Sequence, residues 1–330
     1  MQASRKICII LNESSGDHPE GKDRRARLEE ALDRHGLEYD ILTPEPGTDI
    51  HAYTQRVIRR GNCGMIVAAG GDGTIAGVAG ATHDAGLPMG VIPQGTFNYF
   101  ARGLGIPEDM DAAVKALSIG NLRDVSLGEV NGKVFLNNTS LGIYPLILRR
   151  RESIYRRWGR SRLAAYWSVL LTLIGFRRPL KLKVRLDGRE MRLKTPLAFV
   201  ANSSYQLEEF NLDGADTVRS GKLALFTSRG KGRLGLVNAA LRLAHGSAQK
   251  GEEFSLHTGR DLSIETGRKR ALVARDGEKE LMHTPIRIRL RDQPLRVVAP
   301  VQDAATSGSG EQSHPVPGDQ SPNKLEHGAA

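Results

Sequence analysis

The sequence predicts an α/β domain with a parallel sheet, followed by a β-rich domain built as an antiparallel sandwich. Up to about residue 125, apolar runs alternate with stretches of helical periodicity, as is typical of a parallel sheet covered by helices. Beyond that point short segments alternate charged and apolar residues, which is the period of antiparallel strands with one wet face. We therefore place the first domain at 1–125 and the second at 126–300, and we leave open a return of the last strand to the first domain.

In the first domain, apolar periodicity predicts strands over 6–11, 38–42, 65–69 and 89–92, and helices over 22–35, 49–60 and 74–85. Parallel strands present their carboxyl ends, where ligands bind, at one edge of a sheet. Three loops with glycine or small polar residues follow such ends, so we expect these loops to converge. They are 12–16, 70–74 and 93–98.

In the second domain, alternation predicts strands over 181–187, 259–265, 271–276 and 286–290. Two helical segments, 144–176 and 233–245, interrupt this pattern. From 301 to 330 the chain is rich in serine, glycine and proline and poor in apolar residues, which predicts a disordered tail.

The composition is basic, with 47 Lys and Arg against 37 Asp and Glu. A positive balance favours an anionic partner such as a nucleotide, a nucleic acid or a membrane surface. No nucleic-acid recognition motif accompanies it, so we expect no nucleic-acid partner. The longest apolar stretch, 163–176, is shorter than the roughly 20 residues that span a bilayer, which predicts a protein that is not integral to the membrane.

The two cysteines, Cys8 and Cys63, show no metal-ligand spacing. We expect both to be reduced thiols in or near the core of a cytosolic protein. The first apolar run, 7–11, is too short for a secretory signal and reads as a strand.

The segment Gly70-Gly71-Asp72-Gly73-Thr74 directly follows a buried strand and opens a helix. Glycines let the backbone approach a ligand closely, and a helix N-terminus supplies N–H donors that favour phosphate. Asp72 would repel a phosphate unless a cation lay between them, so the loop predicts a nucleotide–Mg²⁺ site. The competing interpretation is a glycine-rich turn in which Asp72 caps the helix.

Three loops resemble those of the bacterial diacylglycerol kinase-like lipid kinases, a group that includes sphingosine and ceramide kinases. They are Asn12-Glu13-Ser14-Ser15-Gly16, Gly70–Thr74 and Pro93–Arg102; in the second half, Asp276-Gly277-Glu278 is similar to the family's Asp-Gly-Glu. The resemblance covers most of residues 5–300. NAD kinases and phosphofructokinases share the glycine–aspartate loop, whereas its combination with Gly-Thr-x-Asn-x-x-Ala-Arg and Asp-Gly-Glu is specific for the lipid branch. The chain has no Walker A string, in agreement with that branch.

The resemblance implies ATP in a cleft between the domains, with Mg²⁺ held by Asp72 and Asp124. The second domain would present Asp276 and Glu278 to the reacting hydroxyl. We take Asp276 as the base, with Glu278 as the open alternative, whether the pair lies in a strand or in a turn around Gly277. The nucleotide-binding residues that the resemblance implies are Asn12, Ser15, Gly16, Thr43, Gly70, Gly71, Asp72, Gly73, Thr74, Gly95, Thr96 and Asn98.

The chain also departs from the family pattern. Tyr99 stands where the family often has an aspartate, and Ala76-Gly77 stands where it often has Asn-Glu. If that aspartate contributes to Mg²⁺ binding, this site has one carboxylate fewer.

Arginines flank the apolar stretch between 149 and 178, with tyrosine and tryptophan among them. Such a segment suits the headgroup boundary of an anionic membrane, and we predict that it docks the protein peripherally on the inner membrane surface. A core-packed helix with solvated arginines is the competing interpretation.

Together these features predict an ATP- and Mg²⁺-dependent lipid kinase with diacylglycerol as the expected acceptor. Two alternatives stay open: a catalytically weak, nucleotide-sensing protein of the membrane surface, and an NAD kinase.

Overall fold

The first sheet contains β1 (Ile7–Leu11), β2 (Tyr39–Leu42), β3 (Met65–Gly70), β4 (Met89–Pro93), β5 (Asn121–Val125) and β18 (Leu295–Ala299). Their order is β2-β1-β3-β4-β18-β5 in the computed structural model, which describes residues 6–13, 21–143, 145–146, 179–228 and 254–301. All neighbours are parallel except β5, which runs antiparallel to β18. The last strand of the chain is therefore part of the first sheet.

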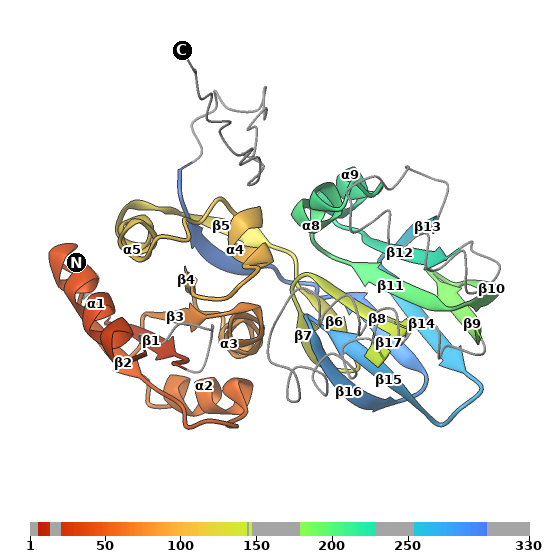
Figure 1. The fold of residues 1–330 in the computed structure, drawn as a ribbon, viewed down its shortest axis with the longest axis horizontal. Coiled ribbons are helices and arrows are strands. Elements are labelled where there is room, and N and C mark those ends of the chain that lie inside the picture. Colours follow the sequence, from red (N-terminus) through yellow and green to blue (C-terminus); the bar gives the residue numbers. More distant parts are fainter. Residues whose placement is uncertain (1–5, 14–20, 144, 147–178, 229–253, 302–330) are drawn as a thin grey trace, which may run out of the picture. The chain divides into compact units, whose positions relative to one another are not determined.

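The helices of this region are α1 (Gly21–Arg34), α2 (Ile50–Ile58), α3 (Asp72–Asp84), α4 (Tyr99–Gly103) and α5 (Met110–Ile119). Aspartates cap two of them: the side chains of Asp49 and Asp109 accept hydrogen bonds from backbone N–H groups at the starts of α2 and α5. Helices α2 and α3 pack together, as do α1 and α5, and Figure 1 shows the two pairs on opposite sides of the sheet. The four strands and three helices predicted for the first domain are confirmed, each boundary to within two residues, whereas α4, α5 and β5 were not predicted.

Helices on both sides explain the composition of the strands. Every residue of β1 and β4 is buried, so these strands are continuous apolar runs rather than alternating ones. Ile9, Ile10 and Leu11 have no exposed surface. The loops at the end of these strands therefore start from a rigid, fully packed edge.

The remaining strands form an antiparallel sandwich. They are β6 (Gly128–Val130), β7 (Lys133–Phe135), β8 (Asn138–Gly142), β9 (Leu180–Leu186), β10 (Arg189–Thr195), β11 (Leu197–Ala201), β12 (Leu223–Ser228), β13 (Phe254–Gly259), β14 (Asp261–Thr266), β15 (Arg270–Arg275), β16 (Glu278–His283) and β17 (Ile286–Leu290). Two sheets make up the sandwich. One, called here the β9 sheet, has the order β10-β9-β14-β17-β6-β7. The other, called the β8 sheet, has the order β13-β12-β11-β8-β15-β16. Apolar residues from both sheets form one core, so the predicted sandwich is confirmed.

Two short helices, α8 (Ser204–Glu209) and α9 (Ala215–Arg219), connect β11 to β12 of the β8 sheet. They contribute to a separate apolar cluster that includes Ala201, Leu207 and Phe226, on the face of the sheet turned away from the sandwich core. The β8 sheet therefore has apolar side chains on both of its faces.

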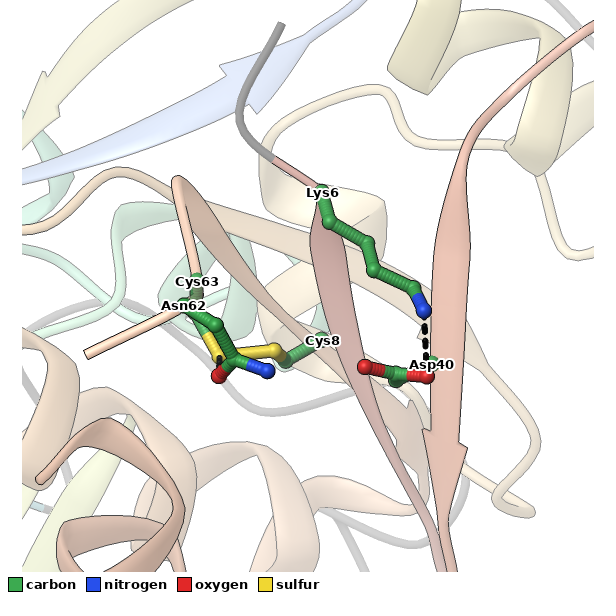
Figure 2. The surroundings of a disulfide bond; sticks show 5 residues. All are labelled: Lys6, Cys8, Asp40, Asn62 and Cys63. Atoms are coloured by element: carbon green, nitrogen blue, oxygen red, sulfur yellow. Dashed lines mark hydrogen bonds and ion pairs between the residues drawn. A yellow bond between two sulfur atoms is a disulfide. The ribbon is translucent and has the colours of Figure 1, made fainter. Parts of the chain in front are cut away.

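The expectation of two reduced thiols is wrong for this structure. Cys8 and Cys63 form a disulfide with their Cα atoms 5.6 Å apart, and both residues are buried (Figure 2). Cys8 lies on β1, and Cys63 lies just before β3, which pairs with β1. Adjacent strands thus bring together two cysteines 55 positions apart in the chain, at a separation that suits a disulfide. The ion pair between Lys6 and Asp40, 2.6 Å long, lies nearby in the same view.

Several predictions concern residues outside the described part of the structure. These are the helical segments 144–176 and 233–245, the basic segment 149–178, the tail beyond Val301, and Ser15 and Gly16 of the first loop. Within the described residues, the structure contains no helix with the length and apolar character needed to span a bilayer.

Candidate active site

The loops that follow β1, β3 and β4 meet at the carboxyl edge of the first sheet. The backbone N–H of Asn12 donates to the carbonyl of Ala69, and the N–H of Gln94 donates to the carbonyl of Gly70, both at 2.9 Å. The Asn12 carboxamide also donates to Thr74 Oγ1 at 2.8 Å, which ties the first loop to the start of α3. The convergence expected from the strand order is confirmed for these residues.

The two glycine loops pack backbone against backbone. A Cβ atom built on Gly95 would lie 2.7 Å from Gly71 Cα and 2.9 Å from Asn98 Oδ1, too close for any side chain. At Gly71 a Cβ atom would lie 3.3 Å from Gly95 Cα, a tight contact, whereas the Gly71 φ of −83° is open to any residue. The result is a side-chain-free surface at the start of α3, which suits the close approach of a phosphate.

Asp72 is the first residue of α3, and its carboxylate points to other elements rather than to its own helix. It accepts hydrogen bonds from the Phe100 N–H at 3.4 Å and from Asn137 Nδ2 at 3.5 Å. Burial raises the pKa of Asp72, and hydrogen bonds from Phe100 and its neighbours oppose that rise. These long bonds leave the carboxylate suited to a nearby cation, and they contradict the interpretation of Asp72 as a helix cap.

Asp124, the second residue predicted to hold Mg²⁺, is exposed on β5. It lines a cavity of about 240 Å³ together with Phe100 and Asn137, the two residues that donate to Asp72. The described residues contain no cluster of three or more His, Cys, Asp or Glu side chains that could enclose a metal ion. Both residues have oxygen ligands of the kind that Mg²⁺ prefers, and their role toward the metal stays a prediction.

Asp276 lies in the two-residue turn between β15 and β16. Asp276 and Gly277 have φ angles of 44° and 86°, the left-handed region that such hairpin turns require. The Asp276 carboxylate accepts three backbone hydrogen bonds, from Leu136 at 2.7 Å, Asn137 at 2.8 Å and Asn138 at 3.1 Å. Burial raises the pKa of Asp276 to about 6, against the opposing effect of these three bonds. The turn thus holds the β7–β8 connection next to Asp72.

Glu278 begins β16, and its side chain is exposed. A Cβ atom on Gly73 would lie 3.0 Å from Glu278 Oε1, so this carboxylate reaches the first turn of α3. The guanidinium of Arg275 lies 3.8 Å from the other carboxylate oxygen. The two acids of the Asp-Gly-Glu turn therefore differ: Asp276 contacts backbone of the second domain, and Glu278 contacts the glycine loop of the first.

The other predicted nucleotide-binding residues occupy different places. Thr43 and Thr96 are exposed on the loops after β2 and β4. Asn98 is buried, and its carboxamide bonds to both the N–H and the carbonyl of Gly95, at 2.9 and 3.0 Å. The Asn98 side chain thus stabilises the loop by bonding to the loop's own backbone. The roles of all these residues toward a nucleotide stay predictions.

Polar residues on β8 and just before it escaped the sequence analysis. The side-chain oxygens of Asn137, Asn138 and Ser140 are buried and have no hydrogen-bond partner. Buried polar atoms normally have partners, so this row is suited to a ligand. The available signal was the polar run Asn137-Asn138-Thr139-Ser140 between the apolar residues Val134-Phe135-Leu136 and Leu141.

Two family models match the chain. The model of the diacylglycerol kinase catalytic domain matches residues 6–130, and that of the YegS C-terminal NAD kinase beta sandwich-like domain matches residues 148–299. Residues 6–130 therefore belong to the diacylglycerol kinase catalytic domain family. The two matches cover the glycine loops and the Asp-Gly-Glu turn respectively, the two parts that the structure brings together.

Individual relatives agree with the family. A diacylglycerol kinase of Bacillus subtilis is 32% identical over 190 residues, which are 56% of this chain and 61% of that protein. A diacylglycerol kinase of Staphylococcus aureus is 34% identical over 138 residues, which are 40% of this chain and 42% of that protein. The aligned part thus spans less than two thirds of these relatives. The crystal structure of a diacylglycerol kinase from Bacillus anthracis has the same fold, with a TM-score of 0.68 at 20% identity, covering 91% of this chain and 98% of that one.

Proposed function

We propose that this chain is an ATP- and Mg²⁺-dependent lipid kinase that transfers the γ-phosphate of ATP to a hydroxyl of diacylglycerol. The contact between the glycine loop and the Asp-Gly-Glu turn carries the proposal, since Glu278 Oε1 lies 3.0 Å from the Cβ position of Gly73. Phosphoryl transfer to an alcohol requires positioned phosphates, neutralised charge and an acceptor for the hydroxyl proton. This juxtaposition can supply all three.

On the nucleotide side, the loop residues Gly71, Gly73 and Thr74 would receive the phosphates at the N-terminus of α3. Asp72 and Asp124 would hold Mg²⁺, which supplies charge neutralisation when it is bound. Ser15 and Gly16 of the first loop remain part of this proposal on the evidence of the sequence.

On the acceptor side, Asp276 is suited to be the base. A carboxylate offers about four lone-pair positions, and backbone N–H groups occupy three of those of Asp276. The remaining position, on the oxygen bonded to Leu136, can receive the proton of the hydroxyl. A pKa of about 6 keeps the group ionised at neutral pH and still able to bind a proton. Glu278 would then face the phosphate and its Mg²⁺.

On the outer face of the β8 sheet, within the apolar cluster to which α8 and α9 contribute, an apolar row leads to buried polar atoms of β8. Leu256, Phe226 and Phe199 lie side by side on neighbouring strands, and Ser140 comes next in the same row. The rings of Phe199 and Phe226 are 6.3 Å apart. The row ends at buried polar atoms without partners, Asn138 Oδ1 and Ser140 Oγ, which supports a hydroxyl-bearing head group at that end of the row.

The membrane forms the final part of the proposal. The lipid acceptor resides in a bilayer, and the basic segment 149–178 would dock the protein on the anionic inner surface. The sequence alone supports this part.

The deciding experiment is transfer of labelled phosphate from ATP with Mg²⁺ into mixed micelles that contain diacylglycerol, ceramide or sphingosine, with NAD as a fourth acceptor. We expect label in diacylglycerol, and its loss in Asp72→Ala. Label in another lipid would correct the substrate, and label in NAD would contradict the lipid branch. ATP binding without transfer to any acceptor would favour the nucleotide-sensing alternative.

A further inference from the structure

Glu108, in the connection between α4 and α5, receives a group of hydrogen bonds that no motif of the sequence indicates. Its Oε1 atom accepts from Asn98 Nδ2 at 3.0 Å and from Arg102 Nε at 2.8 Å, and its Oε2 atom accepts from Arg102 Nη2 at 3.2 Å. The two bonds from Arg102 make a bidentate pair, the strongest geometry for these groups. Glu108 is exposed, and an exposed ion pair contributes little by itself. Its importance lies in the bond to Asn98.

Asn98 is 4% exposed and has a φ of 51°, in the left-handed region. Its carboxamide has two N–H donors, one for the Gly95 carbonyl and one for Glu108, while its oxygen accepts from the Gly95 N–H. A carboxylate can only accept hydrogen bonds. Glu108 therefore favours the same orientation of the Asn98 carboxamide as the Gly95 backbone does, and it helps to hold the Asn98 oxygen on the Gly95 N–H.

Gly95 transmits this arrangement to the phosphate loop. The Cβ position of Gly95 is 2.7 Å from Gly71 Cα and 3.6 Å from the backbone nitrogen of Asp72. Because the two backbones touch without intervening side chains, a shift of Gly95 displaces the start of α3. The sequence of contacts thus runs from Glu108 through Asn98 and Gly95 to Gly71.

The same carboxylate also acts toward the second domain. The guanidinium of Arg102, held by Glu108, lies near the side chain of Tyr205 on α8. The neighbouring Gly103 packs on that residue, with its Cβ position 3.2 Å from Tyr205 Cβ. Tyr205 and Gly103 both line the cavity that contains Asp124. Glu108 is therefore bonded directly to Asn98 and Arg102 of the first domain, and it comes near Tyr205 of the second domain only through Arg102.

We propose that Glu108 is a positioning residue for the nucleotide-phosphate loop: it orients Asn98, which holds Gly95 against Gly71. The expected effect of Glu108 on enzyme kinetics rests on the proposed function, in which the protein uses ATP. Its structural consequence can be measured without a nucleotide.

The test compares Glu108→Gln with Glu30→Gln. Glutamine keeps the size of the side chain but presents an N–H₂ group to Arg102 or Asn98, so one donor loses its acceptor. Glu30 is the matched control, because it accepts from Arg34 at 2.8 Å on the surface of α1, and none of its bonds reaches the loops. In nucleotide-free protein we expect hydrogen exchange of the Gly95 amide to become at least tenfold faster in Glu108→Gln and to stay unchanged in Glu30→Gln.

The kinetic measurement separates positioning from stability. We expect the KM for ATP to rise about tenfold in Glu108→Gln, with a change in kcat below twofold, and no change in Glu30→Gln. Unaltered Gly95 exchange in both Glu108→Gln and Glu108→Ala would overturn the inference. Faster exchange with an unchanged KM would show that the loop arrangement has no role in ATP binding, and would overturn it as well. If the unmodified protein transferred no phosphate, the proposed function would fail, and the exchange measurement would still decide whether Glu108 holds the loop.

Discussion

The two walls of the candidate site are built on different principles. The first wall is formed by the glycine loops of the first domain and depends on close packing of backbone atoms. Gly71 and Gly95 touch because neither carries a side chain, and the strands that lead to them are buried. The second wall is formed by the Asp-Gly-Glu turn of the second domain and depends on the position of a charged group. The Asp276 carboxylate is held by backbone amides of residues about 140 positions away in the chain. Steric changes should therefore damage the first wall, and changes of charge should damage the second.

The largest effect is expected in the second wall. Asp276→Asn removes the proposed base and leaves one of the three backbone amides facing an N–H₂ group. We expect kcat/KM to fall about 1,000-fold, within the range known for general bases. At pH 4, where the buried carboxyl group of the wild-type protein is neutral, we expect the free energy of unfolding to fall by about 1–3 kcal/mol. Glu278→Gln is the control within the same turn: it should lower activity with a change in stability within about 0.5 kcal/mol, because the side chain is exposed. Equal losses of stability in both variants would remove the distinction drawn between the two acids.

The next largest effect is a loss of stability in the first domain, away from the Asp-Gly-Glu turn. Cys8 and Cys63 close a loop of 55 positions, for which the chain-entropy relation gives a stabilisation of about 4 kcal/mol. Reduction of the disulfide, or Cys63→Ser, should lower the free energy of unfolding by that order, as measured by urea denaturation with and without reductant. Intact mass of the native protein, which differs by two hydrogens on reduction, establishes the starting state. A finding of two free thiols in the native protein would contradict this part of the structure.

A steric change in the first wall should come third. Gly95→Ala would force a Cβ atom to within 2.7 Å of Gly71 Cα, so one loop must move. We expect a loss of stability of about 1–3 kcal/mol, as for other overpacked sites, together with weaker ATP binding measured by titration. Gly267→Ala is the matched control, since its Cβ would have no neighbour within 4 Å and its φ is not in the left-handed region. Full ATP affinity in Gly95→Ala would show that the close approach of the loops is dispensable.

The smallest expected effect is a dependence of stability on pH. An ordinary aspartate has a pKa near 4, whereas burial raises that of Asp276 to about 6, so the folded protein binds a proton that the unfolded chain has released. Its contribution to stability is complete below pH 4 and is lost as the pH rises through 6. Burial shifts Asp72 in the same direction. Between pH 4 and 7 we expect the wild-type protein to lose on the order of 2 kcal/mol relative to Asp276→Asn, and parallel stability curves would contradict the assignment.

Part of the site could be predicted because its signals are local. The apolar runs before the loops at 12, 70 and 93 indicate buried parallel strands, and parallel strands end at one edge. The departure at Gly77 shows the limit of such reasoning. A Cβ atom at Gly77 would lie 2.9 Å from Ile50 Cβ, so this glycine serves the packing of α3 on α2, which the pattern of one helix does not indicate.

Other features depended on contacts between distant residues. An Asp-Gly pair suits a strand end or a turn equally well from the sequence, and the pairing of Arg275 with Glu278 decided for the turn. The pairing of Cys8 with Cys63 required the register of β1 against β3. The unpartnered oxygens of Asn138 and Ser140 could be recognised only once the burial of both residues was known.

The sequence by itself determined the strands and helices up to residue 93, the antiparallel character of the domain that follows, and the glycine loops of the first domain. Periodicity and glycine act within a few residues, so their effects are visible in the chain. The tertiary structure decided the amide cradle of Asp276, the reach of Glu278 to Gly73, the disulfide and the bonds of Glu108. Each of these depends on which distant atoms the packing brings within bonding distance, and no local pattern specifies that.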